Sequence, residues 1–471
     1  MRGRRVVVAA ALVCAVAAAV PAALAADDLP PIVDRSVTAL QRGAAAECRR
    51  VAPDDEQCGP IDGRPVSSSR VDAYQRSWVH RALALQATLD DAAPLTEALL
   101  PHTHNTFNSS AYDPTLTNQD PNQPYSITDQ LDMDIRAIEL DVHWVPSPYG
   151  TPGTGGYWPT LCHGNTQGPV HVGCSVDRPL QDGLAEVAGW MTAHPSEFVL
   201  LYLENQLGDS AQAHEVAGSL VESALGRFAL RTPTAAPCEA MDWTQSTTAI
   251  EATGARLVIV GDCSTSVAGG TGWGALVHQR GPHWDESGDP TTYSSPQCSR
   301  DLDARSKAGG NVFRRYFEDS TWVAAAAGSN PVTSSLGGTS TISPAATALM
   351  VRCGVNIIGF DQLTPEDPRL AALVWSWATN EPATGAHGCA YQGGDTHWRL
   401  DNSCGTKRPV ACVSASGVWS VTSRAVPWPR AADACASSFP GSAFAAPPNG
   451  LRNAQLAAAA RSAEVWVNVR L

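Results

Sequence analysis

Residues 135–142 read IRAIELDV, an alternation of apolar and polar side chains that predicts a β-strand. Residues 180–191 then carry apolar side chains at helical spacing, and residues 198–203 (FVLLYL) form a nearly continuous apolar run, typical of a buried strand. This strand–helix–strand order indicates a βαβ unit of a parallel sheet. Residues 256–262 (RLVIVGD) and 355–361 (VNIIGFD) are two further candidates for buried strands.

Acidic side chains stand at or just beyond the ends of these predicted strands. They are Glu139, Asp141, Glu204, Asp262 and Asp361. A TIM barrel keeps its chemistry at the carboxyl ends of its strands, so the pattern predicts an α/β fold of the TIM-like (β/α) barrel type. A doubly wound sheet would collect such residues in the same way, but the chain has no GxGxxG or GxxxxGK[ST] turn to support a nucleotide-binding version.

The amino terminus has the layout of a secretory signal. Three arginines fall within the first five residues, an apolar run covers residues 6–20, and Ala23-Leu24-Ala25 has the spacing of small residues that signal peptidase accepts. The apolar run is rather short for a membrane anchor. We therefore expect residues 1–25 to be removed and the mature protein to be secreted, with no transmembrane segment.

Charge and cysteine content restrict what the exported chain can do. Loss of three arginines with the signal moves the formal net charge from −14 to about −17, which disfavours binding to nucleic acid. Cys14 leaves with the signal, so 12 of the 13 cysteines remain. This even number, without any CxxC pair, predicts disulfides rather than a zinc or redox centre.

Composition divides the exported chain into three parts. Residues 26–70 form an N-terminal extension, and residues 71–380 form the predicted barrel, which begins with a helix at about residues 70–95. Residues 381–471 are rich in Cys and Trp and predict a small, disulfide-bonded, loop-rich module. Residues 265–350 are rich in Gly, Ser and Thr, and no strand is predicted there.

Four short segments follow one another along the chain: Thr103-His104-Asn105-Thr106, Glu139-Leu140-Asp141, Cys162-His163-Gly164 and Leu203-Glu204-Asn205. Each alone is weak, because single histidines and strand-end carboxylates usually have structural roles. In this order they resemble the catalytic X region of phosphatidylinositol-specific phospholipase C, including its secreted, calcium-dependent bacterial forms. The resemblance covers roughly residues 75–210 well and 350–378 loosely. It implies a TIM-like barrel that cleaves the bond between phosphate and diacylglycerol.

The resemblance implies acid–base catalysis by two histidines. His104 would take the proton from the inositol 2-hydroxyl or hold a phosphate oxygen, and His163 would stabilise the phosphorane and protonate the leaving alkoxide. Imidazoles suit both tasks because they titrate near neutrality. His143, on the same strand face as the ELD carboxylates, is interpreted as structural, with a third catalytic histidine or a residue that supports the site as the alternative. Asp361 would orient a histidine or meet substrate hydroxyls, and His102 is expected in a flanking loop.

The resemblance also implies one bound calcium ion, held by Asn105, Glu139, Asp141 and Glu204. Three carboxylates and an amide oxygen suit a hard cation. Glu139 and Asp141 are two residues apart on one strand, so both point to the same face. Arg136 is expected to support its strand or to pair with a carboxylate, with a phosphate contact as the alternative.

The C-terminal residues resemble C-type lectin domains only weakly. The two halves of that fold are in reversed order, and Ala383 interrupts the EPN sugar motif. A generic disulfide-bonded appendage fits as well, so glycan contact through this module stays open.

The expected substrate is a phospholipid at a membrane surface. The eukaryotic enzymes of this family bind phosphorylated head groups with a basic cluster that has no clear counterpart here; residues 314–316 are the nearest candidate. Phosphatidylinositol or a glycosylated derivative is therefore favoured over a bisphosphate. The alternative enzyme is a glycerophosphodiesterase or a sphingomyelinase-D-like phosphodiesterase, although HRG and ENT segments are missing. The alternative from another class is a catalytically silent surface-binding protein.

Overall fold

The computed structural model describes residues 69–112, 121–147, 149–167, 170–172, 178–293, 312–320 and 341–471. The predicted signal at residues 1–25 and nearly all of the N-terminal extension therefore lie outside the described residues. Within the described ranges, no helix combines the length and the apolar character that crossing a membrane requires.

The barrel strands of the main sheet are parallel and curve into a ring that stays open at one seam. Among the described residues, eight strands pair in the order β10-β11-β12-β1-β2-β7-β8-β9. The first strand pairs with the last, Leu100 lying opposite Ile357. The strands therefore follow chain order around a ring, with one seam between β9 and β10. The eight are β1 (Leu100–Thr103), β2 (Ala137–Pro146), β7 (Val199–Gln206), β8 (Leu257–Gly261), β9 (Val277–His278), β10 (Trp284–Ser287), β11 (Phe313–Phe317) and β12 (Ile357–Phe360).

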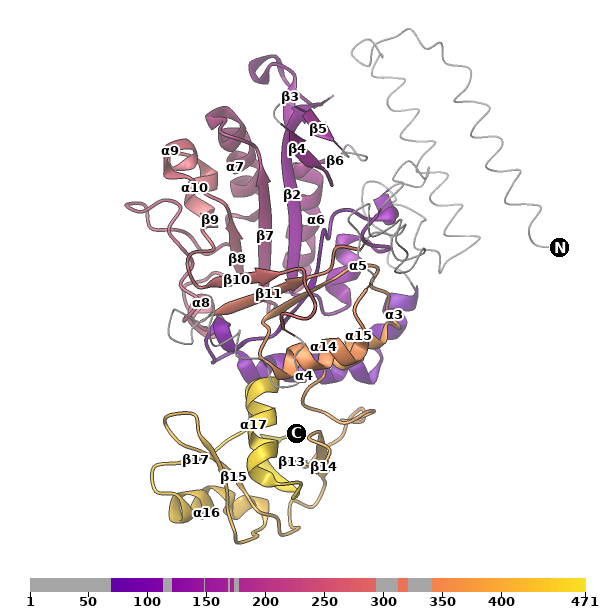
Figure 1. Ribbon diagram of the computed structural model, residues 1–471, viewed down its shortest axis with the longest axis vertical. Coiled ribbons are helices and arrows are strands. Elements are labelled where there is room, and N and C mark those ends of the chain that lie inside the picture. The colour runs from indigo at the N-terminus through magenta and orange to yellow at the C-terminus, as the bar shows by residue number, and fades with distance from the viewer. Residues whose placement is uncertain are drawn as a thin grey trace, which may run out of the picture.

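Helices cover the outside of this ring, as the TIM-like barrel prediction requires (Figure 1). The predicted apolar stripe of residues 180–191 lies on α6, whose Leu180, Leu184, Val187 and Met191 are fully buried. The helices of the barrel are α3 (Ser69–Gln75), α4 (Trp78–Asp90), α5 (Ile127–Asp132), α6 (Leu180–Ala193), α7 (Ala211–Leu225), α8 (Thr247–Glu251), α9 (Thr265–Ala268), α10 (Gly272–Leu276), α14 (Pro344–Arg352) and α15 (Pro368–Ala372).

The strands predicted from apolar runs are confirmed as β2, β7, β8 and β12. The predicted first helix is two helices, because Ser77 caps α4 by accepting a hydrogen bond from the backbone N–H of His80. No strand is predicted in the region 265–350, yet β9, β10 and β11 lie within it. These strands are two to five residues long and read VH, WDES and FRRYF, so they carry no apolar run that periodicity could detect.

Strand β2 extends beyond the barrel and forms a hairpin with β3 (Tyr157–Leu161), which pairs with it antiparallel. The short strand β6 (Arg178–Pro179) continues this ribbon. The CHG segment therefore follows an antiparallel strand of this hairpin and not a strand of the barrel. The same extension places Glu139 and Asp141 in the middle of β2 rather than at its end.

The C-terminal residues form a small module of two three-stranded sheets. As predicted, disulfides stabilise this module. They join Cys389 to Cys404 and Cys412 to Cys435, so Cys404 is not bonded to Cys412, the next cysteine along the chain. A further disulfide, Cys238–Cys263, lies in the barrel. The elements of the module are β13 (Cys389–Gln392), β14 (Trp398–Asp401), β15 (Ala411–Val413), β16 (Trp419–Val421), α16 (Ala431–Ser438), β17 (Ala443–Phe444), α17 (Gly450–Ala460) and β18 (Val465–Arg470).

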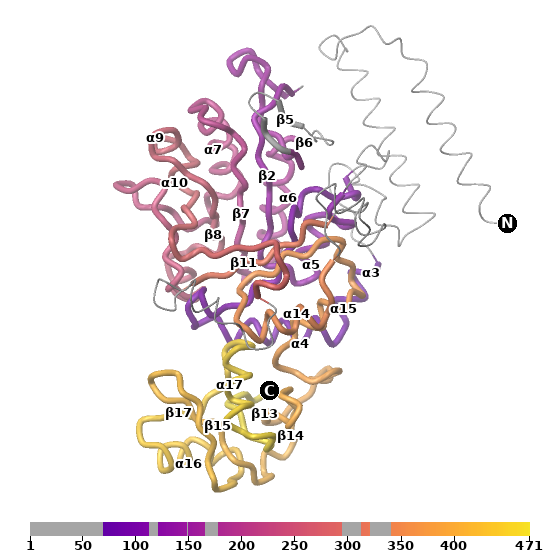
Figure 2. The backbone as a smooth tube through the Cα atoms, in the orientation of Figure 1, coloured from indigo at the N-terminus to yellow at the C-terminus, as the bar shows by residue number. Residues whose placement is uncertain are grey.

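Helix α17 joins the module to the barrel (Figures 1 and 2). Asn453 donates from Nδ2 to the carbonyl of Trp375, and Arg452 forms an ion pair of 2.5 Å with Glu97, which precedes β1. The contacts lie at the amino end of the barrel strands, so the module is at the end of the barrel opposite to the carboxyl ends of the strands.

Candidate active site

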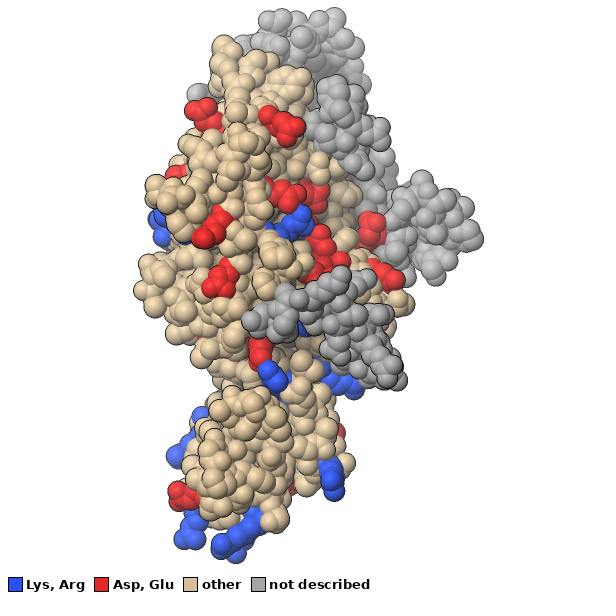
Figure 3. Space-filling model, turned by 60° about the vertical axis from the view of Figure 1, so that its left-hand side comes forward, with Lys and Arg blue, Asp and Glu red and all other residues tan. Residues whose placement is uncertain are grey.

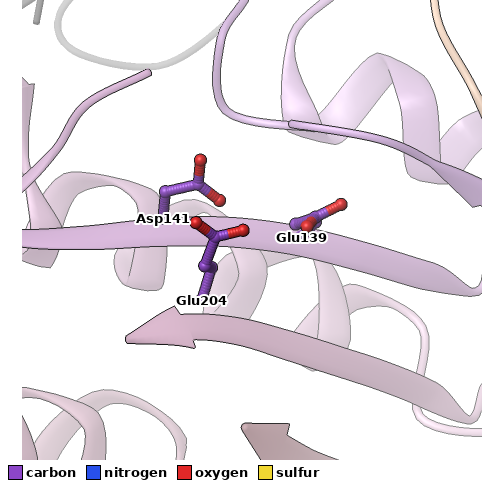
Figure 4. Close-up of side chains that lie close together, drawn as sticks. All are labelled: Glu139, Asp141 and Glu204. Carbon is purple, nitrogen blue, oxygen red and sulfur yellow. The ribbon is translucent and has the colours of Figure 1, made fainter. Parts of the chain in front are cut away.

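Three carboxylates meet inside the barrel (Figure 4). Glu139 and Asp141 come from β2 and Glu204 from β7, where the strand register places Asp141 opposite Glu204. Each residue offers an oxygen that lies within 4.8 Å of those of the other two. The pairing of β2 with β7 thus assembles side chains from two of the four sequence segments.

The charges of this carboxylate cluster are only partly compensated. Burial and the charges of Glu204 and Glu139 raise the pKa of Asp141 well above its usual value. Burial and Glu139 likewise raise the pKa of Glu204. Burial acts on Glu139 as well, but Arg315 and His104 hold the pKa of Glu139 well below its usual range. The cluster therefore has a deficit of positive charge on the side of Asp141 and Glu204.

Asn105 supplies an amide to the same site. Its backbone is left-handed, with φ 45°, a conformation that asparagine tolerates better than most residues. Its backbone N–H donates to Glu139 Oε2 at 3.3 Å, and its Nδ2 donates to Asn122 Oδ1 at 3.3 Å. The segment before α5 thus fixes Asn105 beside the carboxylate cluster.

Three buried oxygens at this place accept no hydrogen bond from any residue that the structure describes: Asn105 Oδ1, Glu139 Oε1 and Asp141 Oδ1. Buried polar atoms without partners are rare and call for an explanation, such as an ion. Oxygen atoms of an amide and of carboxylates are the ligands that calcium prefers. The residues present therefore fit an oxygen-coordinated divalent cation.

His104 lies beside this cluster and is paired with Asp361. Its Nδ1 is 3.3 Å from both carboxylate oxygens of Asp361, which also accepts from the backbone N–H of Ser320 at 2.7 Å and from Gln123 Nε2 at 3.3 Å. Burial lowers the pKa of His104, but the charges of Asp361 and Glu139 outweigh it and raise the pKa to about 9. Of the two roles predicted for Asp361, the structure favours the orientation of a histidine.

Replacement of Asp361 by Asn is expected to lower kcat more than tenfold while KM stays nearly constant. The substitution replaces one of the two oxygens that face His104 Nδ1 by an NH2 donor, so the ring is oriented less firmly, and it removes one charge that raises the pKa of His104. The pKa of His104 should therefore fall in the variant, as an NMR titration of its ring protons would measure. An unchanged histidine titration together with normal kcat would show that Asp361 has a purely structural role.

His163 and His143 lie near the cluster on different elements. His163 is half-buried just after β3, where the backbone N–H of Cys162 donates to the carbonyl of Asp141 at 3.4 Å. His143 is fully buried on β2, on the same face as Asp141, and lies opposite Gln206 of β7. This complete burial favours the structural role for His143.

Two further residues contact Glu139, and one of them was predicted wrongly. His102 lies in β1 rather than in a loop, with Nδ1 2.9 Å from the carbonyl of Ala137 and Nε2 3.6 Å from Glu139 Oε2. Burial lowers the pKa of His102, which favours its neutral form. Arg315 Nη2 donates to Glu139 Oε2 at 2.6 Å. The sequence singled out residues 314–316 as the nearest basic cluster, and in the structure Arg315 of this segment contacts Glu139.

The charged residues around Arg315 continue to the surface. Arg315 Nη1 pairs with Glu286 at 3.1 Å, Glu286 pairs with Arg280 at 2.9 Å, and Arg280 pairs with the largely exposed Asp262 at 2.8 Å. Arg136 is not part of this site. It precedes β2 at the opposite end and pairs with Glu197 at 2.7 Å, which agrees with the predicted structural role.

The sequence profile of the Rv2075c PI-PLC-like domain matches residues 60–367. The chain is 39% identical over 444 residues to the uncharacterized protein Rv2075c of Mycobacterium tuberculosis strain ATCC 25618 / H37Rv, a match that covers 91% of this chain and 87% of the relative. The values are the same for the uncharacterized protein MT2135 of strain CDC 1551 / Oshkosh.

Solved structures of bacterial phosphatidylinositol-specific phospholipases C also match, at low identity. The enzyme of Listeria monocytogenes has 15% identity and a TM-score of 0.37, covering 60% of this chain and 95% of that one. A mutant of the Staphylococcus aureus enzyme has 12% identity and a TM-score of 0.39, covering 63% and 98%. The calcium-dependent enzyme of Pseudomonas sp. has 13% identity and a TM-score of 0.29, covering 59% and 94%.

Proposed function

The chain belongs to the Rv2075c PI-PLC-like family, and from this premise we propose that it is a secreted, calcium-dependent phosphodiesterase. Its substrate is phosphatidylinositol or a glycosylated derivative, which it cleaves to diacylglycerol and an inositol phosphate. The observation that carries the proposal is the combination of a histidine oriented by Asp361 with a cluster of carboxylates. Buried oxygens of this cluster have no hydrogen-bond partner among the described residues.

The two histidines divide the proton transfers. His104 Nδ1 faces Asp361, so Nε2 is the nitrogen left to accept the proton of the inositol 2-hydroxyl. A calcium ion on Glu139 would offset one of the charges that raise the pKa of His104, and so favour the neutral imidazole that this role requires. Loss of this proton lets the 2-oxygen attack phosphorus. His163 is half-buried just after β3, and its neighbour Cys162 is bonded through the backbone to Asp141; it protonates the diacylglycerol oxygen as that oxygen leaves.

Asn105, Glu139, Asp141 and Glu204 are the residues that would hold calcium. When bound, the ion would offset the charge of the phosphate and favour ionisation of the attacking hydroxyl. Arg315 supports this arrangement from the other side, because its contact with Glu139 Oε2 leaves Oε1 for the cation.

An unphosphorylated head group fits the charges around the site best. Arg315 and Arg280 already pair with Glu139, Glu286 and Asp262. A second phosphate on the inositol ring would have to displace one of these carboxylates. Phosphatidylinositol, or a form with a neutral or cationic sugar, requires no such exchange.

The proposal is tested by phosphorus NMR of phosphatidylinositol vesicles with enzyme and calcium. We expect the lipid resonance to be replaced by that of a cyclic or open inositol phosphate, with diacylglycerol as the other product. When a chelator replaces calcium, the phosphorus spectrum should not change with time. Release of phosphatidic acid would instead indicate cleavage on the other side of phosphorus. Turnover of glycerophosphodiesters alone would favour the glycerophosphodiesterase alternative, and absence of any turnover would favour a silent binding protein.

A further inference from the structure

A long stretch beside the site carries no formal charge. Residues 142–176 contain no Asp, Glu, Lys or Arg, although 35 residues at the chain's 17% charged content would hold about six. The stretch includes the end of β2, strand β3, and the short strands β4 (Asn165–Gln167) and β5 (Val170–Val172). Figure 1 places these elements at the end of the molecule opposite the C-terminal module, and Figure 3 shows a tan tip at this end with acidic side chains below it.

This uncharged stretch also presents aromatic side chains to solvent. Among the residues that the structure describes, the exposed large hydrophobic side chains are Tyr149, Tyr157 and Val418, at 46%, 37% and 60% exposure. The two tyrosines lie on the β2–β3 hairpin, where Tyr157 stacks on Trp144 at a centroid distance of 6.0 Å. Rings with a polar edge that are grouped on an uncharged projection suit a boundary between water and an apolar phase.

The tip of the hairpin is built as a defined structure. Thr151 and Thr154 cap the one-turn helix Pro152–Thr154 reciprocally, and Gly155 ends it with φ 65°. Gln212 of α7 donates to the carbonyl of Gly153 at 2.6 Å and so supports the tip from behind. The tyrosines are therefore held on a fixed projection, and docking would cost little ordering of the chain.

The hairpin is a direct continuation of the strand that carries the carboxylate cluster. Pro146, the last residue of β2, is five residues beyond Asp141, which is about 16 Å at roughly 3.3 Å per residue. A surface that touches the tip thus lies close to the proposed site. The C-terminal module is at the other end of the barrel and leaves this approach open.

We propose that the β2–β3 hairpin is the element by which this protein docks on a lipid bilayer, with Tyr149, Tyr157 and Trp144 at the head-group level. The net charge of −14 opposes attraction to an anionic surface, so docking through uncharged aromatic rings is the mode that the charges allow. The identity of the substrate lipid rests on the proposed function, whereas docking itself can be measured without turnover.

The test is co-sedimentation of the full chain with vesicles of phosphatidylcholine alone, in chelator. We expect the wild type to bind and the double variant Tyr149→Ser/Tyr157→Ser to partition at least tenfold more weakly. Tyr149→Phe/Tyr157→Phe should retain binding, because the ring and not the hydroxyl enters the interface. Val418→Ser removes the exposed hydrophobic side chain of the C-terminal module and is the matched control, with binding unchanged.

Equal sedimentation of the wild type and the double Ser variant would overturn the proposal, as would absence of wild-type binding. A wild type that elutes as a dimer, becomes a monomer in the Ser variant and ignores vesicles would assign the hairpin to self-association instead. Should the double variant not fold, Tyr149→Ser alone carries the same comparison. Activity on a soluble inositol phosphodiester should be normal in the Ser variants, and its absence in wild type would count against the proposed function and not against docking.

Discussion

Replacement of His104 by alanine is expected to lower kcat about a hundredfold or more, since a positioned general base typically contributes factors of this size. The substitution removes the imidazole that Asp361 orients and that would accept the proton of the attacking hydroxyl. His163→Ala should cause a loss of the same order, because both proton transfers belong to one reaction. The measurement is steady-state turnover of a soluble inositol phosphodiester with saturating calcium.

His80→Ala is a matched control for these variants. His80 forms another histidine–carboxylate pair, half-buried, with Nδ1 3.0 Å from Asp134, but it lies on α4, away from the carboxylate cluster. Loss of the His80 side chain should change the unfolding temperature and leave kcat unchanged. Near-normal turnover by either His104→Ala or His163→Ala, in protein with wild-type circular dichroism, would refute the two-histidine mechanism.

Replacement of Asp141 by Asn is expected to shift the calcium dependence of activity at least tenfold toward higher concentration. The substitution removes one of the charges that would hold the cation, while the shape of the side chain is kept. The measurement is activity against free calcium, from strong chelator to millimolar concentration. Asp262→Asn, which alters an exposed strand-end carboxylate outside the cluster, should leave the curve in place.

Asp141→Asn should weaken the response to calcium, but in chelator it should not destabilise the fold. Burial and the neighbouring carboxylates raise the pKa of Asp141 in the folded protein, so its ionisation costs folding free energy as pH rises above the unfolded value of about 4. Asn has no such cost. In chelator at neutral pH, Asp141→Asn should therefore unfold at the wild-type temperature or higher, and its stability should depend less on pH.

Calcium should then raise the unfolding temperature of the wild type more than that of the variant, because a ligand stabilises only the state that binds it. Full wild-type activity in strong chelator, with Asp141→Asn slower at every calcium concentration, would instead mean that the carboxylates act without a metal. Arg315 would then be the cation that balances Glu139.

The sequence predicts the barrel strands wherever a strand is a run of apolar residues. Residues 198–203, 256–262 and 355–361 could be recognised because strands buried on both faces leave no room for polar side chains. The same rule fails for β10 and β11. Their residues WDES and FRRYF pair charges within the barrel, and such pairing depends on partners far away in the sequence.

The candidate site, like the barrel, could be predicted only in part from the sequence. The sequence by itself determined that His104, Asn105, Glu139, Asp141 and Glu204 form a pattern, and the i, i+2 spacing on β2 put two carboxylates on one face. Only the tertiary structure decided what surrounds them. Arg315 reaches Glu139 across 176 residues of chain, and Asp361 reaches His104 across 257, because β12 pairs with β1 and β11 pairs with β12. Periodicity reports the neighbours of a residue along its own strand, whereas the charge that a buried carboxylate meets is set by the strands that the closed sheet places opposite it.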